Sequence, residues 1–325
     1  MTVALIATGG TIASLADPST GAVRPAVSAE ELARGLDDVR VDEVARVNGW
    51  NVTPATMLEV ARRVTAALAD DAVEGAVVTH GTDTVEETAF LCDVTVGSDK
   101  PVVFAAAMRS GSEIGADGPR NLRCAAQVGR AAGARGLGAV LVLNDEVHAA
   151  RWARKQDSFR VSAFRSPGHG PIGTVAPGWE RLPAPPSRRV RLELPAALDR
   201  PVPIVHTYTG MEEGLIETVL GATGAGGLVL EGTGLGNVPG SAEPGIAAAL
   251  ARGLPVVVAT RVPSGGTRAV YGGPGGGVTL RDLGVIPAGG LSAAKARLLL
   301  MLLLAVGAGD VRTRFEAAAR ALEGW

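Results

Sequence analysis

The chain has 325 residues, 46% of them hydrophobic, and its 31 basic and 33 acidic side chains nearly cancel. This composition excludes a disordered or polyanion-binding tail. An aromatic content of 3% leaves few rings for stacking on bases, so we expect no nucleic-acid partner. The length predicts about two domains. Cys92 and Cys124 are too few and too far apart for a disulfide framework or a zinc site, so both are expected in the core.

The first apolar run, residues 3–7, predicts a buried strand close to the amino terminus. No Lys or Arg precedes it and a glycine turn follows at once, which is not typical of a secretory signal, so we expect a cytoplasmic protein. Unbroken apolar runs are typical of parallel strands buried on both faces. Six further runs predict such strands at residues 75–80, 101–107, 138–144, 203–207, 226–232 and 254–260.

Helix starts lie between these runs. Thr53 followed by Pro54 predicts an N-cap with proline at the first helical position. Ser28 and Thr84, each with a glutamate three residues later, predict capping boxes. The longest wholly apolar run, residues 298–306, is far shorter than the roughly 20 residues that span a bilayer. It predicts a buried helix, and we expect no membrane partner.

Residues 182–203 interrupt the alternation of strands and helices with six prolines and no regular period. We interpret this segment as a linker. It separates an N-terminal catalytic domain, residues 1–181, from a smaller C-terminal domain, residues 204–325. The predicted fold class is α/β, with two open, largely parallel sheets that carry helices on both faces.

The stretch ATGGTIAS, residues 7–14, lies where the first predicted strand ends. Ligands of open parallel sheets bind beyond the carboxyl ends of the strands. Gly10 permits a sharp turn with backbone N–H groups facing a ligand, and Thr11 offers a hydroxyl. Residues 15–25 are rich in turn formers without a helical period, as in a mobile lid. The alternative is a tight turn without function.

The stretch VVTHGTDTVEET, residues 77–88, again runs from strand through turn to helix start. It places Thr82 and Asp83 where free N–H groups and the positive end of the helix dipole would favour an oxyanion. The alternative is that Asp83 or Thr84 only caps the helix. Residues 81–84 supply more hydroxyl and carboxylate groups than one cap requires.

Lysine is rare in this chain, which has Lys100, Lys155 and Lys295 against 28 arginines. Arginine keeps its proton, whereas a partly desolvated lysine can act as a base. Lys155 follows the strand predicted at residues 138–144, on the same side of the sheet as both threonine loops. The alternative for Lys155 is a solvated surface charge. The other two positions suggest no chemistry, and Lys295→Met is expected to be nearly silent.

The two threonines, Asp83 and Lys155 together predict a hydrolase with a threonine nucleophile and a lysine base, without metal or cofactor. The four histidines have no metal-ligand spacing and are expected to be structural. The string GTGLGN, residues 232–237, is a weak match to a dinucleotide loop, because Asn237 stands at the third glycine position.

The strings ATGGTIAS and VVTHGTDTVEETAF resemble the two signature stretches of the bacterial L-asparaginase family of asparaginase/glutaminase amidohydrolases. The strings PVVFAAAMRS, ADGPRNL, GAVLVLNDEV, TRVPSGGT and KARLLLMLLL also stand in the family's order. The resemblance implies a larger N-terminal and a smaller C-terminal α/β domain. It also implies hydrolysis of a side-chain amide, with L-asparagine giving L-aspartate and ammonia.

Residue by residue, the resemblance implies that Thr11 forms a covalent threonyl ester and that Thr82, Asp83 and Lys155 form a second triad. Lys155 would draw a proton from water through Thr82, and Asp83 would orient the lysine. Which threonine attacks first stays open. Backbone N–H groups near Gly10 or Gly81 would hold the oxyanion, which makes both glycines substrate-binding candidates.

Three positions depart from the family's pattern. Residues 15–30 lack the tyrosine of the family's lid, and residues 268–284 lack the glutamate that a neighbouring subunit supplies in the periplasmic branch. Gly49 and Trp50, also substrate-binding candidates, stand where the family has a serine for the substrate α-carboxylate. Besides an asparaginase, two hypotheses stay open: an amidase for glutamine or a larger amide admitted by Gly49, and a non-catalytic binding protein.

The resemblance also implies active sites that are completed by a neighbour's C-terminal domain. We therefore expect a homodimer or a homotetramer with its sites near subunit interfaces. The glycine-rich residues 272–277 could approach such a site closely.

Overall fold

The computed structural model describes residues 2–186, 189–307 and 309–324. The chain forms two compact units that divide between Leu194 and Pro195. Each unit contains its own open sheet with helices, so the predicted α/β fold class is confirmed. The division falls within the predicted linker, of which residues 187 and 188 lie outside the described residues. The boundaries at residues 181 and 204 stay a prediction.

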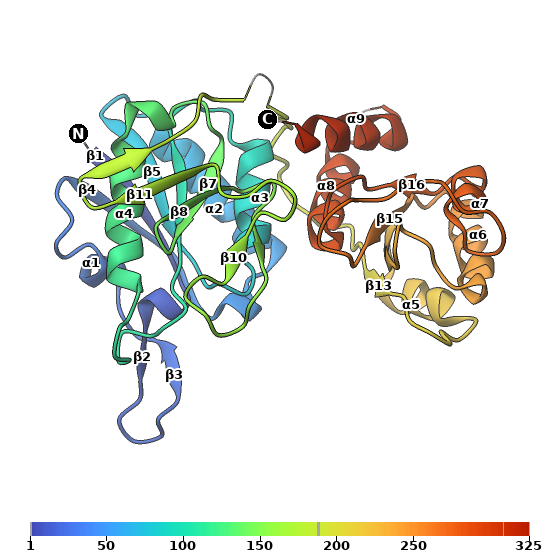
Figure 1. Cartoon of the computed structure of the whole chain (residues 1–325), viewed down its shortest axis with the longest axis horizontal. Helices are drawn as coiled ribbons and strands as arrows, with labels where there is room; N and C mark the ends of the chain where they lie inside the picture. Colours follow the sequence, from blue (N-terminus) through green and yellow to red (C-terminus); the bar gives the residue numbers. More distant parts are fainter. Residues whose placement is uncertain (1, 187–188, 308, 325) are drawn as a thin grey trace. The chain divides into compact units, whose positions relative to one another are not determined.

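The larger sheet has eight strands in the order β12-β11-β8-β7-β6-β5-β1-β4 (Figure 1). Strands β7 to β4 in this order are parallel, and β8, β11 and β12 extend one edge in antiparallel fashion. The strands are β1 (Thr2–Gly9), β4 (Val39–Val47), β5 (Val73–Thr79), β6 (Val102–Ala105), β7 (Ala139–Leu143), β8 (Glu146–Ala149), β11 (Gly173–Ala176) and β12 (Trp179–Arg181).

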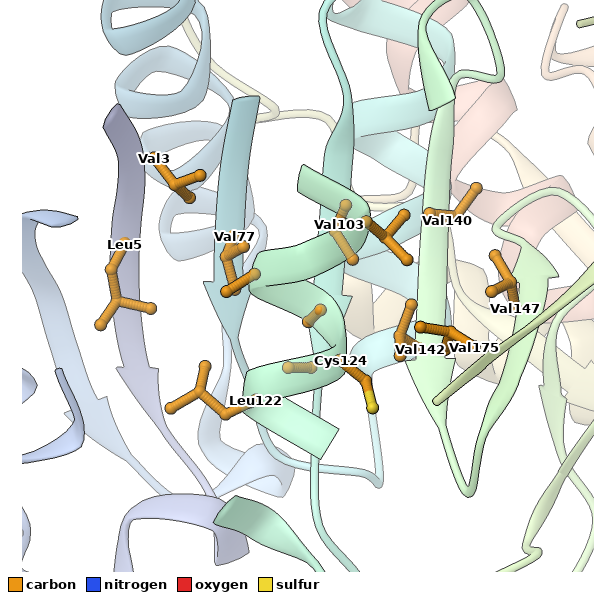
Figure 2. Packing of buried hydrophobic residues seen from close by; sticks show 14 of the residues in the cluster. Val3, Leu5, Val77, Val103, Leu122, Cys124, Val140, Val142, Val147 and Val175 are labelled. Carbon is orange, nitrogen blue, oxygen red and sulfur yellow. The ribbon is translucent and has the colours of Figure 1, made fainter. Parts of the chain in front are cut away.

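Helices cover both faces of this sheet, with α4 on one face and α2 and α3 on the other (Figure 1). Side chains two residues apart in a strand point to the same face, so Val3 and Leu5 both lie on the face of the sheet that α4 covers (Figure 2). Burial on both faces explains why these strands have unbroken apolar sequences. Cys92 and Cys124 are buried, as predicted. The helical segments of this unit are η1 (Thr11–Ala13), α1 (Ala29–Leu32), η2 (Gly49–Asn51), α2 (Pro54–Leu68), α3 (Val85–Thr95), α4 (Gly118–Arg130) and η3 (Ala132–Ala134).

All seven predicted strands are present, but β4 was not predicted. Its sequence VRVDEVARV mixes apolar and charged residues, because β4 is the edge strand of the sheet and is only partly buried. The antiparallel strands β8, β11 and β12 were also missed, since their sequences EVHA, GTVA and WER contain no long apolar run.

Two of the three predicted helix caps are confirmed. Ser28 and Glu31 form a capping box, and the Thr53 hydroxyl accepts a backbone N–H of the first turn of α2. The capping box predicted at Thr84 is wrong. The Thr84 hydroxyl instead donates to the carbonyl oxygen of Gly49 at 2.7 Å, because packing brings η2 against the start of α3.

The smaller unit has a four-stranded parallel sheet in the order β13-β14-β15-β16. Its strands are β13 (Ile204–His206), β14 (Leu228–Gly232), β15 (Val256–Thr260) and β16 (Ile286–Pro287), and its helical segments are α5 (Leu215–Thr223), η4 (Gly240–Ala242), α6 (Glu243–Ala251), α7 (Gly277–Leu283), α8 (Ala293–Val306) and α9 (Val311–Glu323). The run at residues 298–306 lies in α8, as predicted. Across the described residues, no helix has the length and apolar character that a membrane crossing requires.

The structure corrects the expectation for Lys295. This lysine is only 1% exposed within α8. A substitution at a buried position changes packing, so Lys295→Met cannot serve as a silent control. Lys100 is better suited: its ammonium donates to the carbonyl oxygens of Leu68 and Asp70 at the end of α2, beside the amino end of β6.

Candidate active site

The fold brings Lys155 onto Thr82 and Asp83. Lys155 Nζ donates to Thr82 Oγ1 at 2.8 Å and to Asp83 Oδ1 at 2.7 Å. Thr82 and Asp83 lie in the turn between β5 and α3, and Lys155 lies in the short strand β9 (Arg154–Lys155), which pairs with β10 (Phe164–Arg165). These are short, charge-assisted hydrogen bonds, so the three side chains form one connected unit.

Burial differs across this triad. Thr82 is buried, the Lys155 side chain is 20% exposed and the Asp83 side chain is 44% exposed. The lysine is therefore partly removed from water, while its carboxylate partner still reaches solvent.

Three glycines bring the ends of neighbouring strands into backbone contact. A Cβ atom on Gly10 would lie 2.3 Å from Gly81 Cα, and one on Gly81 would lie 2.6 Å from Gly49 Cα, so neither site has room for a side chain. The contact arises because β5, β1 and β4 are neighbours in the sheet. It places Thr11, which follows Gly10, at the same edge as Thr82, which follows Gly81.

Gly49 lies against the backbone of Gly81. A Cβ atom there would lie 3.2 Å from the backbone of Gly81. A side chain at this position would therefore crowd Gly81, and the role of Gly49 in substrate binding stays a prediction. Trp50, the next residue in η2, is 64% exposed, so most of its indole faces solvent.

The Gly10 N–H is not available to an oxyanion. It donates to the carbonyl oxygen of Val47 at 2.9 Å, where β1 runs beside β4. A developing oxyanion at this edge would have to use other N–H groups of the two turns. No carbonyl of the described residues accepts from the N–H of Thr82.

His80 hydrogen-bonds to the turn between β5 and α3 and to α3 itself. It is fully buried, with Nδ1 2.9 Å from the Gly81 carbonyl oxygen and Nε2 2.9 Å from Thr88 Oγ1. Burial lowers the pKa of His80 to about 4, so the ring is neutral at pH 7. Since a carbonyl only accepts, Nδ1 carries the proton and Nε2 accepts from the Thr88 hydroxyl.

The segment expected to be a lid forms a hairpin, with β2 (Ser14–Ala16) antiparallel to β3 (Val23–Pro25) (Figure 1). The loop after β6 forms two hydrogen bonds with strand β2 of this hairpin. Gly111 N–H donates to the Ser14 carbonyl, and Ala16 N–H donates to Ser112 Oγ, both at 3.0 Å. Sequence reasoning missed this loop. The glycines and serines after the strand predicted at residues 101–107 were the available signal.

Comparisons with known proteins cover both units. The model of the asparaginase N-terminal domain matches residues 2–186, and the model of the glutaminase/asparaginase C-terminal domain matches residues 201–315. A probable L-asparaginase of Deinococcus radiodurans is 41% identical over 323 residues, 96% of each chain. A glutaminase-asparaginase of Pseudomonas fluorescens is 33% identical, covering 81% of this chain and 76% of its own.

Among solved structures, a probable cytoplasmic L-asparaginase from Campylobacter jejuni superposes with a TM-score of 0.88 at 29% identity. The match covers 100% of this chain and 99% of that one.

Proposed function

Because this chain belongs to the asparaginase family, we propose that it converts L-asparagine to L-aspartate and ammonia through a covalent threonyl ester on Thr11. An asparaginase-type amidohydrolase agrees with the names of its relatives. The observation that carries the proposal is the contact of Lys155 Nζ with Thr82 and Asp83, at the strand edge where Thr11 follows Gly10.

In the first half of the proposed reaction, the Thr11 hydroxyl attacks the carbonyl carbon of the side-chain amide. A C–O bond forms, the C–N bond breaks, and the hydroxyl proton goes to the leaving nitrogen, which departs as ammonia. Backbone N–H groups of the two turns, such as that of Thr82, stabilise the negative oxygen of the tetrahedral intermediate.

In the second half, water attacks the ester carbonyl. Lys155 draws a proton from this water through the Thr82 hydroxyl, while the carboxylate of Asp83 stabilises the ammonium that forms. The C–O bond to Thr11 breaks and the proton returns from Lys155 to the threonine oxygen, which leaves the product as a carboxylic acid and frees the enzyme. The acid ionises to aspartate and ammonia takes up its proton, so atoms and protons balance over the two halves.

Ammonia release from L-asparagine, L-glutamine and simple amides tests the activity. We expect release from L-asparagine. Faster release from L-glutamine would favour the second candidate, which the name of the Pseudomonas relative supports. No release from any amide would favour a non-catalytic binding protein.

Mass spectra of enzyme quenched during turnover test the nucleophile. A covalent adduct is expected on the peptide that contains Thr11, and Thr11→Val should abolish it. An adduct that survives in Thr11→Val but is lost in Thr82→Val would reverse the assignment. Full turnover in both variants would show that neither threonine is the nucleophile.

A further inference from the structure

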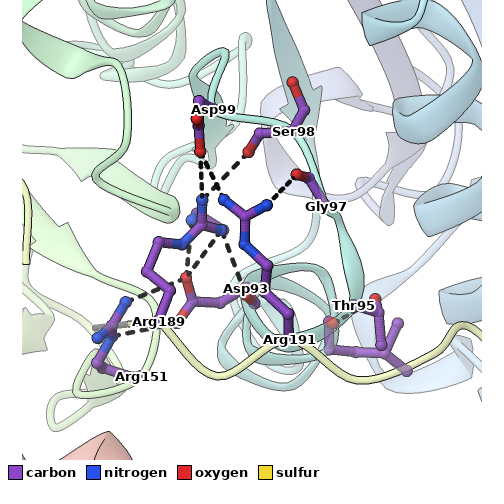
Figure 3. Close-up of polar contacts among 10 residues, drawn as sticks. Asp93, Thr95, Gly97, Ser98, Asp99, Arg151, Arg189 and Arg191 are labelled. Atoms are coloured by element: carbon purple, nitrogen blue, oxygen red, sulfur yellow. Dashed lines mark hydrogen bonds and ion pairs between the residues drawn. The ribbon is translucent and has the colours of Figure 1, made fainter. Parts of the chain in front are cut away.

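Helix α3 holds the segment that carries Lys155 at two points. Glu86 Oε2 accepts the backbone N–H of Lys155 at 2.7 Å. Two turns further along α3, the buried carboxylate of Asp93 accepts from Arg151 Nε at 3.2 Å (Figure 3). Glu86 and Asp93 are seven residues apart, so they lie on the same face of the helix. This face of α3 therefore binds both ends of the segment 151–155.

The direction of the Lys155 N–H explains why this segment needs a partner outside its own hairpin. Gln156 N–H donates at 2.8 Å to the carbonyl of Ala163, the residue directly before β10. Successive N–H groups of a strand point to opposite sides, so the N–H of Lys155 points away from β10. Strand β9 has only two residues, and the carboxylate of Glu86 takes the place of a further strand.

We propose that Glu86 is a positioning residue for Lys155, an inference that rests on the proposed function. Residues 82–86 then bind the lysine twice. The side chains of Thr82 and Asp83 bind its ammonium, and Glu86 binds its main chain. With the backbone fixed in this way, the flexible lysine stem starts from a defined point, and its amine stays within hydrogen-bond reach of the Thr82 hydroxyl. Misplacement of a catalytic group by about 1 Å can cost about 100-fold in rate.

Length and charge can be separated at this position. Glu86→Gln keeps the length of the side chain and an oxygen that accepts, but removes the charge. Glu86→Asp keeps the charge and shortens the reach. If Glu86 positions Lys155, Glu86→Gln should retain turnover within about 3-fold. Glu86→Asp should lower kcat by about 10- to 100-fold with a much smaller change in KM. An electrostatic role alone predicts the opposite order.

Glu87 provides a matched control. It lies beside Glu86 in the first turn of α3, where both carboxylates interact favourably with the helix dipole. Glu87→Asp therefore repeats the same chemical change one residue away, and we expect its turnover to equal that of the unaltered protein within about 2-fold. Equal kcat values in Glu86→Asp and Glu87→Asp, or a larger loss in Glu86→Gln than in Glu86→Asp, would overturn the proposal.

Amide hydrogen exchange gives a readout that does not depend on the reaction. The Lys155 amide should exchange slowly in the unaltered protein and in Glu86→Gln, and about 10-fold faster in Glu86→Asp. Unchanged exchange in Glu86→Asp would contradict the contact. Absence of ammonia release from the unaltered protein would refute the proposed function, while the exchange rates would still decide whether Glu86 holds Lys155.

Discussion

Lys155 is the residue whose replacement tests the proposed second half-reaction most directly. Lys155→Met keeps much of the aliphatic stem but removes the amine that bonds to Thr82 and Asp83. Loss of a positioned acid–base group typically lowers the rate by about 10²- to 10⁴-fold, and a loss of that size is expected in steady-state ammonia release. Ester formation should be less affected than ester hydrolysis, so the adduct on Thr11 should accumulate.

Lys100→Met is the matched control for charge and residue type. Lys100 donates to two carbonyl oxygens at the end of α2, and its loss should affect stability by about 1 kcal/mol without changing turnover. Equal losses of turnover in the two lysine variants would contradict the role of Lys155.

His80 predicts a pH dependence of stability. Its pKa is lowered by burial from 6.5 to about 4, so the unfolded chain binds a proton that the folded protein does not bind between these values. The contribution of His80 is therefore complete above about pH 6.5 and is lost as the pH falls toward 4, by about 3 kcal/mol in total. Urea unfolding measured from pH 4 to 7.5 should show this decline.

His80→Gln serves as the control because glutamine does not titrate. Its unfolding should take up about one proton fewer at pH 5 than that of the unaltered protein. A smaller slope should remain, since burial also lowers the pKa of His148. Identical pH slopes for the variant and the unaltered protein would contradict the prediction.

The turns that follow β1 and β5 can pack against η2 only because the residues in contact are glycines. A Cβ atom at Gly81 would lie 2.6 Å from the Gly49 backbone, which cannot move aside as a flexible side chain could. Gly81→Ala should therefore lower the free energy of unfolding by about 1–3 kcal/mol and reduce turnover, because Thr82 follows directly. Gly97→Ala is the matched control, since nothing lies within 4 Å of a Cβ atom there. Equal stability of the two variants would refute this account of the turn.

The α3 start also explains why local capping rules failed there. Thr84 has the residue type and the spacing of an N-cap, yet its hydroxyl bonds to Gly49, and the acidic residue two positions later bonds to Lys155 rather than serving only the helix. At a site where several loops meet, long-range partners compete with the local backbone for each polar side chain.

For the whole molecule, we predict a homo-oligomer, either a dimer or a tetramer. Besides the resemblance, the exposure of two aromatic rings supports it: Phe159, four residues after Lys155 in the chain, is 82% exposed, and Trp50, next to Gly49, is 64% exposed. Such rings are typical of surfaces that a partner covers. Sedimentation should give a mass at least twice the 32.9 kDa of one chain. A fully active monomer at micromolar concentration would contradict this prediction.

Local patterns were sufficient for much of the fold. Residues buried on both faces must be apolar, so the seven runs located all the parallel strands except β4 and β16, and the proline-rich stretch located the region where the units divide. The candidate site followed from the same logic. Carboxyl ends of neighbouring parallel strands share one edge, so the turns that contain Thr11 and Thr82 could be expected to meet.

Other features depend on which distant segments pack together, and no local pattern encodes that choice. The Gly10 N–H pairs with the Val47 carbonyl, the Gly81 backbone lies against Gly49, and the Thr84 hydroxyl bonds to Gly49 rather than capping α3. The hydrogen bond from the Lys155 N–H to the Glu86 carboxylate joins residues 69 positions apart. Such contacts form only when the folded backbone brings a donor within about 3 Å of an acceptor, a distance that residue type and spacing along the chain do not specify.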